Sequence, residues 1–517
     1  MKTKPTAKKT APPPKAAMPA LKHWKALLSC LFAVAVFLFF YLGQTHVLIY
    51  HEWTQMFQFT DAYFLDRIVV PGGLARYLGE FLSQFFRTPW LGAVIMSLLV
   101  VAVQWLGWAV ARRDGAGEVA FALSFVPALV LLYFLGDADV QVSYPVAMVA
   151  ALASCLLFRP SWKSALAMMP FVVVFYLLFG TTVYIIVLYE VMALIVTGIR
   201  TKQLAKNLIV AVLLAAFTVA VVWVSTFYTP YPFARIFKGI PYYSFSNILP
   251  PLQIHTMWIT AVVLAVMTLL PRWKVNAIIV ALIAVVIVAI GMKMSAAKYD
   301  SDINYLIKYD SLVYTEQWDT ILKMDDTVNR SSTMSVACCD LALALRGQLA
   351  DNLFNYPQMG PEGLFIFMQS DNLSLNLLGE IFLNMGMVNE AQRFYYDSQE
   401  SQYNTNKCSR LMKRLTEIEI INGQYDVARK YLNQLATTLY YRDWANEQLL
   451  LLGNEDAVNN HPFYGRLRSL RPKEDYIFQP NSMFYTIKDL YDYNPENYVA
   501  EQYLKAVVAM KQNSMRR

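Results

Sequence analysis

Two aspartates just beyond the first apolar run are the residues of this chain best suited to do chemistry. Asp61 and Asp66 lie five residues apart in the segment FTDAYFLDRI, which is too polar to cross a bilayer. A carboxylate at the outer surface of a membrane could serve as a general base, so we predict both as candidate catalytic residues. In a structural alternative, one of them caps a helix and the other pairs with Arg67 or Arg76.

A second acidic pair, Asp137 and Asp139, follows a later apolar run in the segment GDADVQVSY. If both acidic loops reach the same side of a membrane and meet in one cavity, their oxygens could bind a divalent metal ion. Short polar turns between membrane spans often have the same composition, which is the structural alternative. The chain has five histidines and no Walker A, GxSxG or HExxH motif, so no other cofactor is predicted.

Three cations near the same surface could bind an anionic substrate. Arg76 precedes the second apolar run, and Arg235 and Lys238 are the cations of segment 228–253. A lipid-linked phosphate needs such donors at the level of the lipid headgroups. Membrane lipids and a lipid-linked sugar phosphate are therefore the predicted ligands, although the aromatic residues of this segment also fit an interfacial belt.

Glu190 is a carboxylate inside an apolar run, near the middle of VYIIVLYEVMALIV. A charge at that depth is costly and usually faces the interior of a helix bundle with a polar partner. Gln44, His46 and Gln104 are the predicted candidate neighbours. A protonated glutamate that is hydrogen-bonded to a neighbouring helix is the structural alternative to a functional role.

The composition indicates that an integral membrane protein positions these groups. Of the 517 residues, 56% are apolar and only 16% are charged, which departs from ordinary globular usage. We predict an all-α protein whose residues 26–295 form a polytopic membrane helix bundle of about nine spans. The nine apolar runs are 26–50, 89–111, 118–135, 144–158, 164–180, 181–199, 207–227, 256–270 and 275–292.

The distribution of charge predicts the orientation of these spans. Residues 1–25 carry seven lysines among proline and alanine and should form a disordered cytoplasmic tail. With this tail inside, 16 basic residues lie in cytoplasmic segments and five lie outside, in agreement with the positive-inside rule. Nine spans then place residues 296–517 outside the cytoplasm, which requires a tight hairpin at Gly180 within 164–199.

Residues 51–88, between the first two runs, contain a turn followed by an amphipathic segment. Pro71, Gly72 and Gly73 make the turn. Apolar residues then share one face of a helix and polar residues share another, which predicts a helix lying in the membrane interface. The apolar face consists of Leu74, Leu78, Phe81 and Phe85, and the polar face of Arg76, Glu80, Gln84 and Arg87.

Residues 296–517 contain no long apolar runs. Apolar residues recur there at helical spacing, with polar residues between them. The pattern G-x4-A-x2-[FY] begins at Gly386 and again at Gly423, 37 residues later. Glycine can end a first helix in a left-handed conformation, and the small alanine lets a second helix pack closely. The pattern resembles tetratricopeptide repeats and predicts a soluble helical-repeat domain, with an irregular segment at 461–494 and a closing helix at 495–512.

Segments 59–93 and 341–364 (LALALRGQLADNLFNYPQMGPEGL) resemble an uncharacterised family of Bacteroidetes multi-spanning membrane proteins, a domain of unknown function. This resemblance covers essentially the whole chain and implies a bacterial inner membrane, which makes the domain 296–517 periplasmic. The layout is also distantly similar to GT-C-type membrane glycosyltransferases, which place a catalytic Asp or Glu in the first outer loop. The chain departs from that class in lacking a paired acidic motif directly after the first run.

Two functional hypotheses from different classes follow. In the first, the protein is a lipid-linked sugar transferase, with Asp61 or Asp66 as the base and Arg235 and Lys238 on the lipid phosphate. In the alternative, it is a non-enzymatic envelope assembly or scaffold protein that binds a protein partner through its repeats. The net basic charge of the chain comes largely from tails and loops beside membrane spans, so no nucleic-acid partner is predicted. The hypotheses differ in whether the outer aspartates meet in one cavity.

Overall fold

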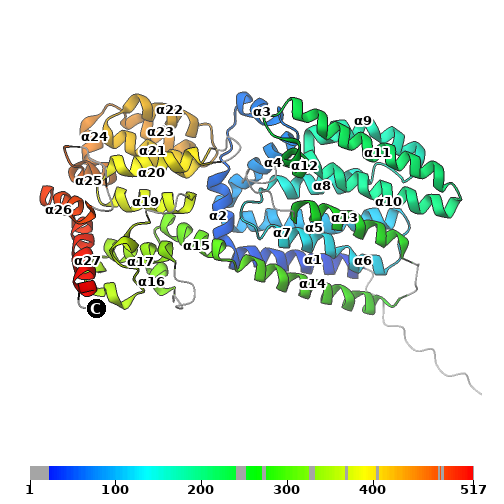
Figure 1. Cartoon of the computed structure of the whole chain (residues 1–517), viewed down its shortest axis with the longest axis horizontal. Coiled ribbons are helices and arrows are strands. Elements are labelled where there is room, and N and C mark those ends of the chain that lie inside the picture. Colours follow the sequence, from blue (N-terminus) through cyan, green and yellow to red (C-terminus); the bar gives the residue numbers. More distant parts are fainter. Residues whose placement is uncertain are drawn as a thin grey trace, which may run out of the picture.

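The computed structural model describes residues 23–239, 252–270, 275–324, 332–366, 371–402, 407–474, 478 and 482–515. The chain is helical across these ranges, with no strand in them, which confirms the predicted all-α class. Two parts lie end to end (Figure 1): an apolar bundle from α1 (Trp24–Leu38) to α14 (Ala277–Tyr299) and a helical domain from α15 (Asp302–Tyr314) to α27 (Tyr498–Met515). Nearly all of the predicted basic tail lies outside the described residues.

Five segments of the described chain, rather than the nine predicted, are long and apolar enough to cross a membrane. This finding agrees with a membrane protein of the predicted kind but reduces the number of candidate spans. The five segments are Trp24–Gly43 (α1 and its π-helical end), Pro89–Arg113 (α5), Trp162–Thr201 (α9 and α10), Leu204–Phe227 (α11 with η4, Ser225–Phe227) and Ala277–Tyr299 (α14).

The prediction of nine spans fails because two predicted runs, 164–180 and 181–199, fall in the single segment Trp162–Thr201 and three others fold as short helices. An α-helix rises about 1.5 Å per residue and the hydrocarbon core is about 30 Å thick, so helices of this length fall short of a full crossing. The short apolar helices are Val119–Phe134 (α6, Val119–Leu123, and α7, Phe125–Phe134), Ser143–Cys155 (α8) and Ile254–Leu269 within α13 (Leu252–Leu269).

The predicted break at Gly180 is present. Helix α9 (Trp162–Phe179) ends there, three residues form a 3-10 turn (Gly180–Thr182), and α10 (Val183–Thr201) begins. Gly180 has a φ of 70° and ψ of −148°, a conformation that glycine adopts at little steric cost. Both helices then pack against α11 (Leu204–Val224), so the 40-residue apolar stretch consists of two helices.

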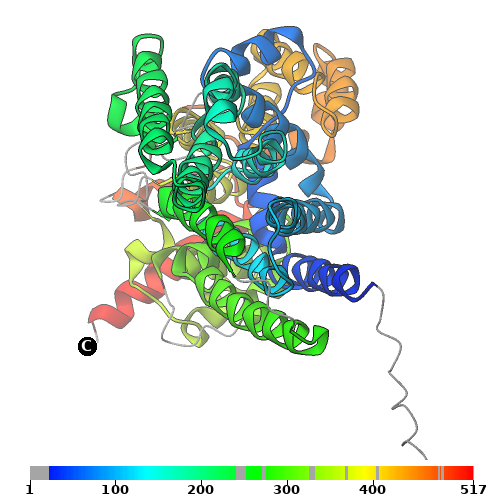
Figure 2. The same ribbon diagram turned by 90° about the vertical axis from the view of Figure 1, so that its right-hand side faces the viewer.

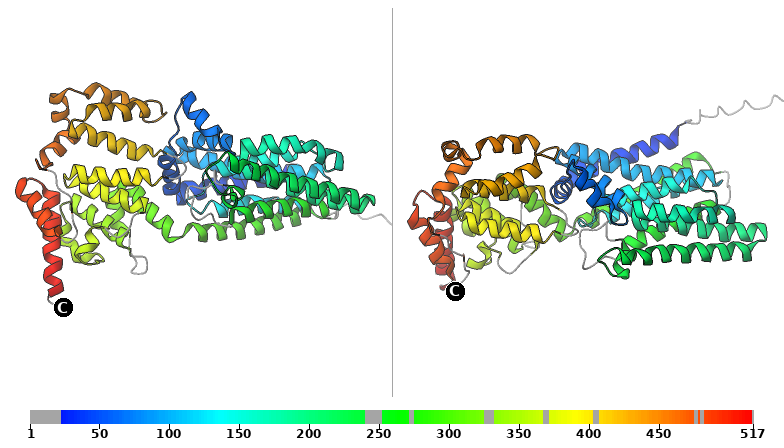
Figure 3. Two further views of the ribbon diagram at one scale, coloured as in Figure 1. Left: turned by 45° about the horizontal axis from the view of Figure 1, so that its top comes forward. Right: turned by 90° about the horizontal axis from the view of Figure 1, so that it is seen from above.

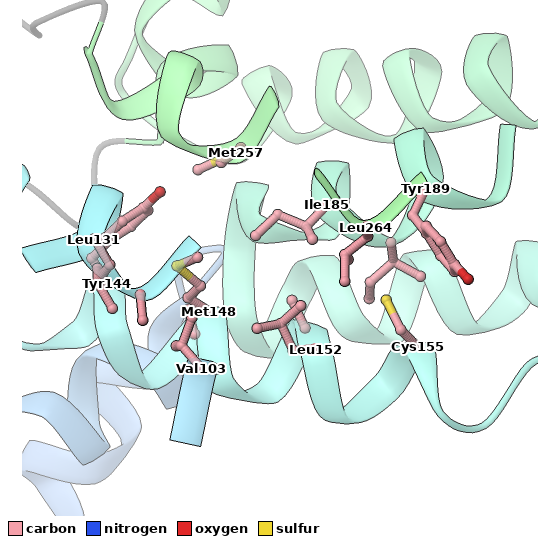
Figure 4. Packing of buried hydrophobic residues seen from close by; sticks show 14 of the residues in the cluster. Val103, Leu131, Tyr144, Met148, Leu152, Cys155, Ile185, Tyr189, Met257 and Leu264 are labelled. Atoms are coloured by element: carbon pink, nitrogen blue, oxygen red, sulfur yellow. The ribbon is translucent and has the colours of Figure 1, made fainter. Parts of the chain in front are cut away.

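Apolar side chains from five helices fill the centre of the bundle (Figure 4). All of the residues labelled there are at most 5% exposed, and such close packing of many side chains supplies the main stabilisation within the bundle. Figure 2 views the same helices from the end of the bundle. The labelled residues come from α5 (Val103), α7 (Leu131), α8 (Tyr144, Met148, Leu152, Cys155), α10 (Ile185, Tyr189) and α13 (Met257, Leu264).

The predicted amphipathic segment forms helix α4 (Gly73–Ser83), but its polar face is buried within the protein. Arg76 and Glu80 are 6% and 1% exposed, whereas the apolar residues on the opposite face keep some exposure. The helix approaches α8 so closely that a Cβ at Gly79 would lie 2.4 Å from the backbone nitrogen of Ser143. The charges therefore face the protein interior, where they need partners.

The helical domain is a series of packed hairpins that includes both copies of the sequence pattern. Gly386 follows the first helix of one hairpin and Gly423 ends the first helix of the next, with φ values of 84° and 75°. Ala391 and Ala428 are fully buried in the second helix of each hairpin. These hairpins are α19 (Asn372–Asn384) with α20 (Val388–Glu400), and α21 (Ser409–Asn422) with α22 (Tyr425–Leu435).

The prediction that segment 461–494 is irregular is wrong, because most of its described residues are helical. Helix α25 (Pro462–Leu470) and helix α26 (Met483–Tyr493) lie in it, and α25 begins with a proline, which fits the first turn of a helix. The closing helix is present as α27.

The remaining elements are α3 (Asp61–Ile68), η2 (Gln84–Arg87), α12 (Phe233–Lys238), α16 (Trp318–Lys323), α17 (Thr333–Leu345), α18 (Leu349–Asn352), η6 (Leu353–Asn355), η7 (Pro361–Leu364), α23 (Arg442–Leu451) and α24 (Glu455–Asn460).

Helix α2 (Thr45–Thr54) joins the two parts (Figure 3). Its Trp53 is 1% exposed and belongs to the apolar core of the helical domain. Just after α2, the backbone N–H of Met56 donates to the carbonyl of Lys407 (3.1 Å), and that of Phe59 donates to the carbonyl of Thr437 (2.9 Å). The start of the segment 51–88 is therefore a docking element for the helical domain.

Candidate functional site

The two predicted catalytic aspartates lie on helix α3 and are exposed to solvent. Asp61 occupies the first turn, where a negative charge is favourable, and Thr60 caps the helix by accepting a hydrogen bond from the backbone of Tyr63 (3.2 Å). Asp66 accepts a 2.6 Å ion-pair contact from Arg67. These positions resemble the structural alternative, and a catalytic role for either residue stays a prediction.

A buried ion cluster lies behind α3, centred on Glu80 of α4. Arg67 donates to Oε2 of Glu80 at 2.8 Å and Arg76 donates to Oε1 at 3.0 Å. The Tyr63 hydroxyl lies 2.5 Å from Oε2. Burial raises the pKa of Glu80, but the charges of Arg76 and Arg67 and the hydrogen bonds from Tyr63 and Arg67 outweigh it and lower that pKa below its usual value.

Arg76 also lines a small cavity at the edge of the bundle, beside α12. Its volume is about 50 Å³, and most of the other lining side chains are apolar or aromatic. Arg235 and Lys238 occupy the last turn of α12 and are partly buried. Of the three predicted phosphate-binding cations, Arg76 lines the cavity, whereas Arg235 and Lys238 lie on the helix that contributes Ile236 to it. Among the residues lining the cavity are Val70, Pro71, Tyr176, Tyr231, Ile236 and Gly239.

The second acidic pair lies elsewhere, between α7 and α8. The backbone N–H of Asp139 donates to Asp137 at 3.2 Å, and the neighbouring Gly136 carbonyl accepts from Asn304 of the helical domain at 3.1 Å. Within the described residues, no group of three or more His, Cys, Asp and Glu side chains is placed to hold a metal ion. Among the described residues the two acidic loops therefore do not meet in such a group, and a metal site at Asp137 and Asp139 stays a prediction.

Glu190 has a different partner from those predicted. Its Oε1 accepts a hydrogen bond from the backbone N–H of Ser161, the residue that caps α9, at 3.3 Å. Gln104, a predicted neighbour, instead accepts from Ser29 (2.8 Å) and donates to Ser124 (2.9 Å). The predicted partners are wrong because the chain between α8 and α9 brings the N-terminus of α9 next to Glu190. The sequence alone does not show which segments of the chain lie next to each other in the fold.

An open polar groove of about 600 Å³ crosses the helical domain beside α20. Four of its residues lie at positions i, i+3, i+4 and i+7 of α20 and so share one face of that helix. The facing side is formed by the end of α21, the turn before α22 and the residue after α25. The groove is lined by Asn389, Gln392, Arg393, Tyr396, Glu419, Asn422, Gln424 and Arg471.

One hydrogen-bond chain orders the amides of this groove. Arg471 donates to Oδ1 of Asn422 at 2.6 Å, and the Asn422 amide donates to Oδ1 of Asn389 at 2.9 Å. Each amide in the chain is held by a neighbour from another helix. Hydrogen-bonded side chains of this kind are ordered before a ligand arrives.

A second chain orders the other end of the groove. Gln392 donates to Oε1 of Glu419 at 2.7 Å, and the hydroxyls of Tyr396 and Tyr431 lie 2.8 Å apart. Burial raises the pKa of Glu419, although hydrogen bonds from Tyr396 and Gln392 oppose this effect. The groove was not predicted. The helical spacing of Asn389, Gln392 and Tyr396 in the sequence could have indicated one polar face of α20, but nothing in the sequence indicates which residues form the opposite wall.

The comparisons with known proteins place the chain in a family without assigning an activity. A family of unknown function, DUF6057, matches residues 21–514. No curated protein and no solved structure matches the chain. The match covers nearly the whole chain, which confirms the predicted relationship to a family of unknown function, and the protein is therefore a member of the DUF6057 family.

Proposed function

We propose that this protein is a membrane-anchored scaffold whose helical domain binds a segment of another envelope protein. The polar groove beside α20 carries this proposal, because its amides, guanidinium groups and tyrosines are ordered by hydrogen bonds and remain open to solvent. In this proposal the helical domain belongs to the tetratricopeptide-like class and lies on the periplasmic side of the inner membrane, with the N-terminus cytoplasmic.

The chemistry of the groove fits an extended polar peptide. A side-chain amide offers one acceptor and two donors, so Asn389, Gln392 and Asn422 can match the N–H and C=O groups of a bound main chain. The groove offers few apolar surfaces, and side-chain recognition therefore depends on polar groups such as Arg393 and Glu419. Recognition through main-chain hydrogen bonds is a recurring mode of peptide binding.

The test is complementation of a deletion strain with groove variants. Asn389→Ala together with Asn422→Ala should leave the protein level unchanged and abolish complementation, because the amide chain is lost. A photoreactive residue at Gln424 should form an adduct with an envelope protein in the parent and lose it in the double variant.

The matched control replaces two exposed asparagines outside the groove, Asn433→Ala and Asn460→Ala. This control should complement fully and keep the adduct. Full complementation by the groove variant at normal protein level would overturn the scaffold proposal.

A second candidate function, transfer of a lipid-linked sugar, is favoured by the cavity at Arg76. Its apolar lining beside one guanidinium group suits an anionic amphiphile, and Asp66 is connected to Arg76 through Arg67 and Glu80. Against it, Asp61 and Asp66 are exposed on α3 and neither lines the cavity.

The aspartates separate the two functions. Asp61→Asn and Asp66→Asn should each complement the deletion if the scaffold proposal holds. A deletion-like envelope glycolipid profile from either variant, at normal protein level and with an unchanged profile from the groove variant, would favour the transferase.

A further inference from the structure

A buried carboxylate lies where the bundle meets the helical domain. Glu52 of α2 is 4% exposed, and its Oε1 accepts a hydrogen bond from the hydroxyl of Tyr441 at 3.3 Å. Tyr441, between α22 and α23, is itself 4% exposed. The pair therefore connects the two parts of the protein through one hydrogen bond that is shielded from water.

Tyr441 is the centre of a small hydroxyl cluster drawn from several elements. Ser409 of α21 donates to its hydroxyl at 3.2 Å, and the hydroxyl of Tyr314 of α15 lies 3.4 Å away. The guanidinium of Arg87 of η2 lies 4.8 Å from the centre of the Tyr441 ring. Glu52 thus accepts a hydrogen bond from the central hydroxyl of this cluster, with Arg87 as the nearby cation.

Two other charged groups at this junction, Asp310 and Arg410, are paired with each other. Both carboxylate oxygens of Asp310 lie 2.8 Å from the fully buried Arg410, which in turn lies over the ring of Tyr314 at 4.6 Å. Arg410 is therefore not a dedicated counterion for Glu52. Arg87 is the cation whose charge lowers the pKa of Glu52 and so favours its ionised form.

Two neighbouring titratable groups, His51 and Cys408, are neutral close to pH 7. Burial lowers the pKa of His51 to about 4 and raises the pKa of the Cys408 thiol to about 12. Burial also raises the pKa of Glu52 to about 7, and this effect exceeds the opposing contributions of Arg87 and the Tyr441 hydrogen bond. Among these groups, Glu52 is the one that changes charge near neutrality.

We propose that Glu52 and Tyr441 form a proton-dependent latch, which holds the helical domain against the bundle when Glu52 is neutral and loosens it when Glu52 ionises. This latch is independent of the groove and of any partner bound there. An ionised carboxylate at a water-excluded junction with one cation nearby disfavours the docked arrangement, and undocking returns the charge to water.

The sign of the pH effect follows from linkage. The docked pKa of Glu52 is raised to about 7 from an ordinary 4.5, so docking is strongest below pH 4.5 and weakens as pH rises through 7. A shift of that size corresponds to a change of roughly two orders of magnitude in the docking equilibrium. Most of this change falls between about pH 5 and pH 7.5, which is roughly the interval between the undocked and the docked pKa of Glu52.

Hydrogen exchange of the intact protein in lipid nanodiscs tests the latch. The reporters are the amides of Met56 and Phe59, which donate to carbonyls of the helical domain. After correction for intrinsic exchange, their protection should fall at least tenfold between pH 5.5 and pH 7.5. Glu52→Gln should keep high protection at both pH values, because a neutral amide oxygen still accepts from Tyr441.

Two further variants keep the outcome clear. Burial also raises the pKa of Asp340, in the core of the helical domain, to about 7, so Asp340→Asn should retain the pH response of the reporters. If Glu52→Gln fails to fold, Tyr441→Phe should move the transition to higher pH, because the hydrogen bond that lowers the pKa of Glu52 is gone. Unchanged protection in the parent across this range, or a parent-like response in Glu52→Gln, would overturn the proposal.

Discussion

At the residue scale, the most tightly defined feature is the ion cluster of Arg67, Glu80 and Arg76. The sequence places Arg76 and Glu80 one turn apart on a polar helix face, which alone suggests an exposed pair of small value. The fold buries both and adds Arg67 from α3, so that Glu80 compensates two guanidinium groups. The same residue pattern therefore acquires a larger energetic role through burial.

We expect Glu80→Gln to lower the free energy of unfolding by about 3–5 kcal/mol, because Arg67 and Arg76 lose the buried carboxylate that they share. Thermal unfolding of the purified protein in detergent measures this change. Since the pKa of Glu80 is lowered in the folded protein, its stabilisation is present above the unfolded pKa and is lost as pH falls.

The control for this prediction is Asp66→Asn. Asp66 pairs with Arg67 at the surface, where its side chain is 64% exposed, so the loss should be below about 1 kcal/mol. Equal effects of the two substitutions would contradict the assigned role of Glu80.

At the element scale, the hairpins of the helical domain depend on glycines in left-handed conformations. Gly386 and Gly423 have nearly the same φ values, but their surroundings differ. A Cβ at Gly386 would lie 2.7 Å from the Cβ of Leu470, whereas a Cβ at Gly423 would have no neighbour within 4 Å. Identical positions in the sequence pattern therefore have different tertiary constraints.

Gly423→Ala should destabilise the protein by about 1–2 kcal/mol, the cost of a left-handed L-residue. Gly386→Ala should lower the free energy of unfolding by about 1–3 kcal/mol more than Gly423→Ala does, because the added methyl group is too close to Leu470. Urea unfolding followed by circular dichroism compares the two. Gly347→Ala, with a φ of 67° and open surroundings, should match Gly423→Ala, and a ranking with Gly386 as the mildest would disprove the packing explanation.

At the scale of the whole molecule, two apolar cores meet at α2 and the residues that follow it. Trp53 belongs to the core of the helical domain, and Met56 packs with residues of α21–α23. Because α1 leads directly into this element, the helical domain has a defined position relative to the bundle. Under the proposed scaffold function, the docked domain would hold a bound partner at a defined position relative to the membrane.

The proposed orientation is measurable with reporter fusions. Alkaline phosphatase, which is active only outside the cytoplasm, should be active when fused after Arg517 and inactive when fused after Gly115, in the segment between α5 and α6, which follows the basic pair Arg112 and Arg113. The charge distribution is the physical reason, since basic residues resist translocation. The reverse pattern of activities would place the helical domain in the cytoplasm.

The sequence by itself determined the all-helical class, the contrast between an apolar part and a polar helical part, the break at Gly180 and the repeated Gly386 and Gly423 positions. Each is a local property of composition, periodicity or glycine conformation. The tertiary structure alone decided which apolar runs are long enough to cross a membrane, because helix ends depend on packing. It also decided that α4 turns its charges inward and that Glu190 meets the cap of α9. The groove wall and the Glu52–Tyr441 contact join residues that are far apart in the chain, and such approaches leave no periodic signal in the sequence.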